Sequence, residues 1–150
     1  MSDFTDRINT SIKEAMKAKD KERLTTLRDI KSKLLLEATS GSGVEVSDEM
    51  AAKICLKLHK QRKETYALYV EQGREDLAAE ELAQSNIIEE FLPKMLSEDE
   101  IRTEVSQCIK NLNASGMSDM GKVMGFLSKK LAGKADGRVI STLVKEELSL

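Results

Sequence analysis

The chain has 150 residues, of which 24 are lysine or arginine and 26 are aspartate or glutamate, so its net charge is −2 at pH 7. Such a balance excludes a global attraction for nucleic acid, and any binding of that kind must come from a local patch. With one proline, no tryptophan and 3% aromatic residues, the composition favours helix over sheet.

Apolar residues recur at the spacing of amphipathic helices along the whole chain. Four patterns precede Pro93, namely Asp3–Ala18, a second helix after Asp20, a third from Ser47 to Gly73, and Glu75–Leu92. A run of small residues over 40–47 predicts a linker between the second and third helices. Pro93 ends the fourth pattern, because the residue before a proline is pushed out of the helical region.

The organisation restarts after Pro93 with three shorter helices. Ser97 and Glu100 form a capping box, and we expect Ser118 with Asp119, and then Asp136, to cap the next two helices. The sequence therefore predicts an all-α fold. It consists of an N-terminal, bundle-like domain of about four helices over 1–93 and a small three-helix domain over 94–150.

Four stretches of the sequence resemble a known family. "FLPKMLSEDEI" and "MGKVMGFLSKKLAGKADGRVISTLVKEEL" are similar to the GatB/YqeY tail, the C-terminal domain shared by the B subunit of the tRNA-dependent amidotransferase and the YqeY-like proteins. "KERLTTLRDIKSKLLLEA" and "HKQRKETYALYVEQGREDLAAEEL" resemble the YqeY-like proteins in particular. The resemblance implies an all-α fold of two domains. In the amidotransferase, the related tail domain contacts the outer corner of tRNA, while the amidation chemistry resides elsewhere.

Two glycines interrupt the apolar pattern that begins at Met120. Gly121 and Gly125 are four residues apart and share one helix face, where each costs roughly 0.5–1 kcal/mol relative to alanine. They would either let another helix pack closely or admit an RNA backbone. Between Met120 and Lys145 the only acidic residue is Asp136. We therefore predict an RNA-binding site at Gly121, Lys122, Gly125, Lys129, Lys130, Lys134 and Arg138.

A second basic stretch lies on the third predicted helix, where Lys53, Lys57 and Lys60 share a face. This face would either extend the RNA surface or be an ordinary solvated face opposite the apolar stripe. His59 lies in the same basic helix, and we expect no metal site there. No motif for a catalytic nucleophile or a cofactor is present, so we expect no catalytic residue and no cofactor.

The remaining features suggest an intracellular protein. Cys55 and Cys108 each lie in an apolar pattern and are expected to be buried free thiols. The first residues do not read as a signal peptide, and no apolar run reaches the roughly 20 residues of a membrane span. We expect a cytoplasmic location and no membrane partner.

These observations predict a protein that binds tRNA or another structured RNA and performs no covalent chemistry of its own. The main alternative is an accessory or protein-interaction module of a tRNA-dependent amidotransferase, a carbon–nitrogen ligase with glutamine as amido-N-donor. Its partner would then be the amidotransferase or the translation machinery. A third and weaker alternative is a small-molecule enzyme with its site in a cleft between the two domains.

Overall fold

The computed structural model describes residues 3–40 and 46–149, and every regular element in those ranges is a helix. This confirms the all-α class predicted from the sequence. Of the linker predicted over 40–47, residues 41–45 lie outside the described part of the chain. The elements are α1 (Asp3–Ala18), α2 (Lys21–Ser40), α3 (Asp48–Glu71), α4 (Glu75–Glu89), α5 (Glu98–Asn111), η1 (Met117–Asp119), α6 (Met120–Lys130) and α7 (Gly137–Leu148).

Several helix ends are set by the local capping that the sequence predicts. Ser47 caps α3, and its side chain accepts a hydrogen bond from the Met50 N–H at 3.2 Å. Ser97 and Glu100 form both hydrogen bonds of the capping box that begins α5. Gly73 follows the end of α3 with a φ of +73°, a conformation that strains residues with a Cβ atom.

The start of α6 differs from the predicted cap at Ser118 and Asp119. Residues Met117–Asp119 instead form a 3₁₀ turn, and α6 begins at Met120 without a side-chain cap. The Asp119 carboxylate accepts a hydrogen bond from the Ser115 backbone N–H at 2.8 Å, so it closes the preceding loop and does not cap the helix.

Helix α4 ends at Glu89, before the predicted end at Leu92. The backbone N–H groups of Glu90, Phe91 and Leu92 donate to carbonyls three residues earlier, at 3.3, 3.0 and 3.1 Å. The chain therefore tightens into a turn ahead of Pro93, because a proline disfavours the helical region for the residue before it.

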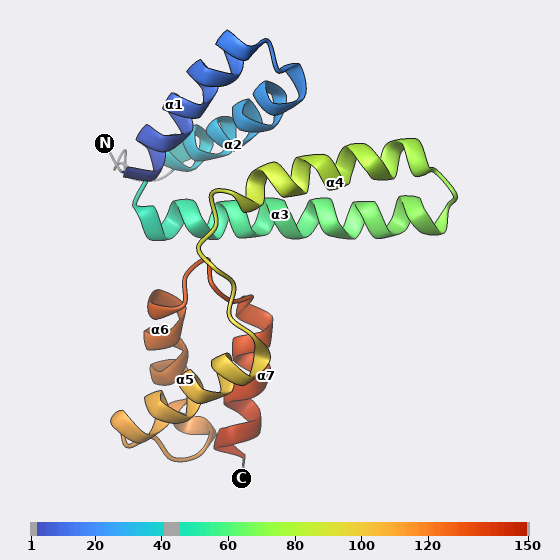
Figure 1. Cartoon of the computed structure of the whole chain (residues 1–150). Coiled ribbons are helices and arrows are strands. Elements are labelled where there is room, and N and C mark those ends of the chain that lie inside the picture. Colours follow the sequence, from blue (N-terminus) through green and yellow to red (C-terminus); the bar gives the residue numbers. More distant parts are fainter. Residues whose placement is uncertain (1–2, 41–45, 150) are drawn as a thin grey trace. The chain divides into compact units, whose positions relative to one another are not determined.

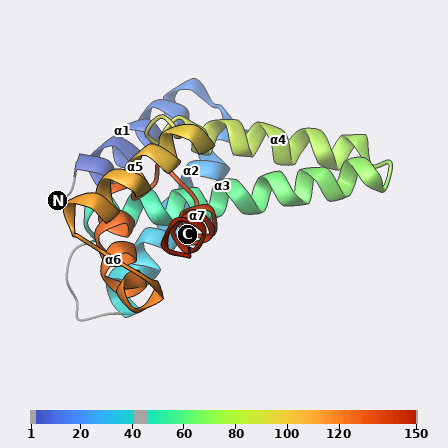
Figure 2. The ribbon, with the colours of Figure 1, turned by 90° about the horizontal axis from the view of Figure 1, so that it is seen from below.

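The chain divides into two compact units, Met1–Leu92 and Pro93–Leu150. In the first unit, α3 and α4 run side by side as a long helical hairpin, and α1 and α2 pack against this pair (Figures 1 and 2). The core of this unit includes five side chains with no exposed surface, those of Leu27, Ile30, Ala51, Cys55 and Ile88.

In the second unit, α5, α6 and α7 each contact the other two (Figure 1). Their shared core is centred on Val105, Val123, Leu127 and Val144, which have no exposed surface. Each unit thus has a hydrophobic cluster of its own. The assignment of 1–93 and 94–150 as separate domains stays a prediction.

Candidate nucleic-acid interface

The two glycines of α6 lie on a face that no other described part of the second unit covers. Gly121 and Gly125 are exposed, and a Cβ atom added at either position would have no neighbouring atom within 4 Å. The buried side of the same helix is formed by Val123 and Leu127. Close packing against another helix of the second unit therefore does not explain these glycines.

Two of the predicted lysines share this exposed face. Lys122 lies three residues before Gly125 and Lys129 four residues after it, so helix geometry places both lysines beside this glycine. Both side chains are exposed, and neither forms an ion pair with any residue in the described ranges. Their ammonium groups are therefore available to an anionic partner. We call Gly121, Lys122, Gly125 and Lys129 the α6 strip.

The other predicted cations of this region differ in their surroundings. Lys130 Nζ lies 2.7 Å from Glu104 Oε2 on α5, so a carboxylate offsets its charge. Lys134 is exposed in the turn that follows α6, and its carbonyl accepts a hydrogen bond from the Leu96 N–H at 2.9 Å. The structure thus distinguishes a paired lysine from unpaired ones that the sequence pattern treats alike.

Arg138 belongs to another surface of the second unit. It lines a groove of about 280 Å³ between α5 and α7, together with the carboxylates of Glu98 and Glu146. Asp136 caps α7 and accepts a hydrogen bond from the Arg138 N–H at 2.9 Å. The Asp136 carboxylate thus occupies the helix start, and Glu98 and Glu146 are paired with Arg102 at 3.2 and 3.1 Å. These charges offset one another, so the groove lacks the excess positive charge of the α6 strip.

Phe126 lies on the exposed face of α6, and the sequence pattern alone did not single it out. Its side chain is 48% exposed. The residue falls outside the apolar stripe that includes Val123 and Leu127, at four residues from both Lys122 and Lys130. That departure from the helical period is the signal that would have identified it, because a core phenylalanine keeps to the buried stripe.

The second basic stretch is less uniform than its sequence suggests. Lys53 and Lys57 are exposed on α3, whereas Lys60 is half-buried. Arg62, farther along the same helix, is turned towards the neighbouring helices. Its Nη2 lies 2.6 Å from Asp29 Oδ2 on α2, and its Nε donates to Gln84 Oε1 on α4 at 3.0 Å. Arg62 therefore ties three helices together within the first unit.

His59 has a carboxylate neighbour that the sequence did not reveal. Its Nε2 lies 3.8 Å from Glu89 Oε2 on α4. Burial lowers the pKa of His59, against the opposing effect of Glu89. No group of three or more metal-binding side chains occurs in the ranges that the structure describes. His59 is therefore part of the contact between α3 and α4.

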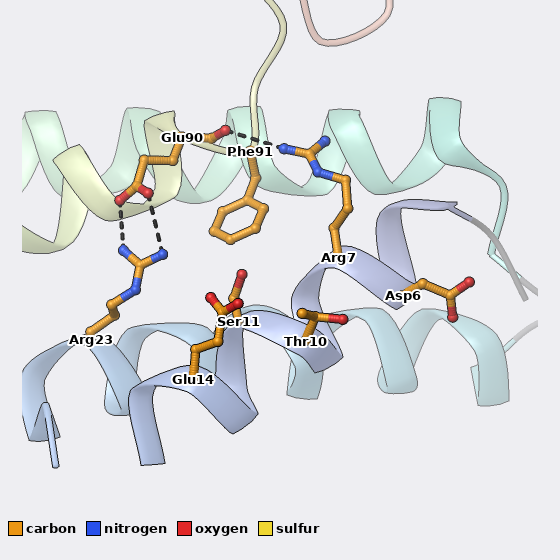
Figure 3. Close-up of a pocket in the computed structure, with 8 residues that line it drawn as sticks. All are labelled: Asp6, Arg7, Thr10, Ser11, Glu14, Arg23, Glu90 and Phe91. Atoms are coloured by element: carbon orange, nitrogen blue, oxygen red, sulfur yellow. Dashed lines mark hydrogen bonds and ion pairs between the residues drawn. The ribbon is translucent and has the colours of Figure 1, made fainter. Parts of the chain in front are cut away.

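A polar groove of about 400 Å³ lies within the first unit (Figure 3). The Glu90 carboxylate accepts two hydrogen bonds from Arg23, at 2.7 and 3.2 Å. The Arg7 guanidinium donates to the Glu90 carbonyl at 3.3 Å and lies 5.5 Å from the centroid of the Phe91 ring. Both arginines of the groove are thus already bound by the protein. The lining residues are Asp6, Arg7, Thr10, Ser11, Glu14, Arg23, Glu90 and Phe91.

The two cysteines are buried free thiols, as the sequence predicts. Burial raises the pKa of Cys55 to about 12 and also raises the pKa of Cys108. Each thiol therefore stays protonated at neutral pH, and neither has the environment of a reactive thiolate.

The fold and the exposed strip thus define an all-helical protein of two units with an uncovered basic helix face. The chain belongs to the YqeY-like protein family, whose profile matches residues 5–148. This confirms the resemblance drawn from the sequence. No helix in the described ranges combines the length and the apolar character needed to cross a membrane.

Relatives of two kinds are similar to this chain. The first is one of the subunits of glutamyl-tRNA(Gln) amidotransferase from Thermococcus gammatolerans, 38% identical over 72 residues, which are 45% of this chain and 12% of the Thermococcus protein. The second kind is "Altered inheritance of mitochondria protein 41, mitochondrial". The Kluyveromyces lactis protein is 28% identical over 89% of this chain and 69% of its own length. The Lachancea thermotolerans protein is 26% identical over 97% of this chain and 79% of its own length.

The predicted cytoplasmic location is wrong in the light of these relatives. The fungal proteins that match most of the chain carry mitochondrial names. The prediction relied on the free thiols and on first residues that do not read as a signal peptide. Free thiols are compatible with any reducing compartment and therefore do not distinguish one such compartment from another.

Proposed function

We propose that this protein binds structured RNA of the tRNA class through the α6 strip. The observation that carries the proposal is that both glycines of α6 face open space beside two exposed lysines without ion-pair partners in the described chain. Glycine within a helix lowers its stability, and here no packing contact offsets that cost. A partner that must approach the helix backbone closely would account for glycine at both positions.

The chemistry of the strip suits a phosphate backbone. Lys122 and Lys129 would each contact a phosphate, and the missing side chains of Gly121 and Gly125 would let ribose and phosphate reach the helix surface. Contacts of this kind set the position and orientation of the RNA without reading its bases. The name of the Thermococcus relative, which includes glutamyl-tRNA, supports tRNA as the first RNA to test.

The test is the double variant Lys122→Ala/Lys129→Ala, titrated with a tRNA transcript at several salt concentrations. We expect weaker binding at low salt, because two phosphate contacts are lost. The plot of log K against log salt should become flatter by about one unit per lysine removed.

The matched control is Lys13→Ala/Lys17→Ala, which removes the same charge from exposed positions of α1. The control should bind with the affinity and salt dependence of the original protein. Equal losses in both double variants would mean that net charge alone governs binding. Unchanged binding in the Lys122/Lys129 variant would exclude the strip.

A second candidate function is an accessory module of a tRNA-dependent amidotransferase, and the similarity to the Thermococcus protein favours it. In that case the strip would contact another protein of the complex. Affinity capture from extract with and without nuclease treatment separates the two functions. Stoichiometric amidotransferase subunits that survive the nuclease support the accessory role, and their loss supports tethering through RNA.

A further inference from the structure

The exposed phenylalanine of α6 lies among the lysines of the same helix. Lys122, Lys129 and Lys130 are at four residues before, three after and four after Phe126. On a helix surface, residues three or four apart are neighbours, with Cβ atoms about 5–6 Å from one another. The ring is 48% exposed, and no cation–π or ring contact to it is found in the described residues, where both cation–π contacts involve Arg7.

An exposed ring in this position is poorly explained by the protein's own packing. The buried side of α6 contributes Val123 and Leu127 to the core of the second unit, and Phe126 is not part of that core. A solvent-exposed aromatic ring among lysines combines a stacking surface with phosphate-binding groups. This combination is typical of proteins that bind unpaired bases, which stack on the ring while the backbone is held by cations.

We propose that Phe126 stacks on an unpaired base of the bound RNA, so that the α6 strip prefers RNA with an exposed loop base over a continuous duplex. This inference rests on the proposed RNA-binding function and extends it to the class of RNA. In a continuous A-form duplex the bases are stacked on one another, and a side chain cannot reach their flat faces. The charge of the neighbouring lysines favours RNA over an apolar or a basic protein surface as the occupant.

The experiment compares two RNAs of equal phosphate number. One is a hairpin with a single-stranded loop, and the other is a blunt duplex that contains the hairpin's stem sequence and is lengthened by further base pairs until the phosphate numbers match. The full chain should bind the hairpin more tightly. In Phe126→Ala the affinity for the hairpin should fall about tenfold, since removal of one stacking contact has effects of this order. The affinity for the duplex should stay unchanged, and the salt dependence should also stay unchanged because no charge is removed.

Two further variants test whether the preference for the hairpin requires an aromatic ring at position 126. Phe126→Trp should restore the preference for the hairpin, whereas Phe126→Leu, which keeps an apolar side chain, should not. Equal losses on both RNAs, full hairpin affinity of Phe126→Leu, or a change in the sedimentation coefficient of Phe126→Ala would overturn the inference. The last result would show that the ring contacts a second copy of the chain.

The same titrations separate failure of this inference from failure of the proposed function. If the original protein binds neither RNA, the RNA-binding function fails and the inference fails with it. If it binds both RNAs and Phe126→Ala does not discriminate between them, only the role of Phe126 is overturned. Because the side chain is half exposed, the alanine variant should keep the unfolding free energy of the original protein, as measured by urea denaturation.

Discussion

Gly121 and Gly125 show how single residues of this chain depart from what folding alone would select. Alanine would fit at either position without meeting another atom of the described chain, and it is the better helix former. Gly73, by contrast, has a φ of +73°, so its lack of a side chain is required by the turn itself. The sequence places Gly73 at the end of a helical pattern and the other two glycines inside one, and the backbone conformation agrees with this difference.

Cys55 gives a prediction for the pH dependence of stability. The thiol is fully buried, and its pKa rises from 9.0 to about 12 because burial penalises the thiolate. The unfolded chain therefore loses this proton first as the pH rises. The buried, protonated thiol of Cys55 makes its full contribution to the unfolding free energy below pH 9. Between about pH 9 and 12 this contribution falls by up to about 1.4 kcal/mol per pH unit.

The measurement is urea denaturation from pH 8 to 10.5 of the original protein and of Cys55→Ala. The unfolding free energy of the original protein should fall more steeply above pH 9 than that of the variant. Parallel curves would show that Cys55 is accessible to water in the folded protein. Comparison with the variant removes the contributions of lysine and tyrosine side chains, which the two proteins share.

At the scale of the helix, the position of nearby carboxylates decides which basic stretch stays available. On α6, Lys122 and Lys129 have no acidic partner in the described chain, whereas Lys130 is paired with Glu104 from α5. On α3, Arg62 is bound to Asp29 of α2. Each of these pairs joins two different helices, so charge patterns along one helix did not reveal them.

The Lys130–Glu104 pair predicts a variant that binds tRNA more tightly, whereas the lysine variants should bind it more weakly. Glu104→Gln keeps the shape of the side chain and removes its charge, which releases Lys130 for a phosphate. The affinity for tRNA should rise about two- to fivefold at low salt, in keeping with the modest strength of exposed ion pairs. Glu64→Gln on α3 is the control, with the same charge change at an exposed position. An equal rise in both variants would exclude a specific role of Lys130.

Helix boundaries were predictable where local chemistry determines them. The Ser47 cap and the Ser97–Glu100 capping box depend on residues within one turn, and the structure contains both. The predicted cap at Ser118 and Asp119 was wrong, because the Asp119 carboxylate bonds to the loop residue Ser115. A short polar side chain has several backbone N–H groups within reach, and the sequence alone does not determine which of them donates to it.

At the scale of the whole molecule, the all-α class and the YqeY-like family followed from helical periodicity and from a few specific stretches. The candidate site was predictable only in part. The sequence identified the basic, glycine-containing segment, but it grouped Arg138 with the strip although that residue lines a groove with Glu98 and Glu146. It also missed Phe126, although the position of this residue outside the apolar stripe of α6 was the available signal.

The most direct test of the α6 strip is the full chain carrying Gly121→Ala and Gly125→Ala, measured for tRNA affinity and for unfolding free energy. Ser106→Ala on α5 is the control, since it also places alanine at an exposed helix position. Both variants should be at least as stable as the original protein, with a gain of about 0.5–1 kcal/mol for Gly125→Ala. We predict that only the glycine variant loses tRNA affinity, by about fivefold or more. A stabilised glycine variant that binds tRNA as well as the original protein would contradict the account.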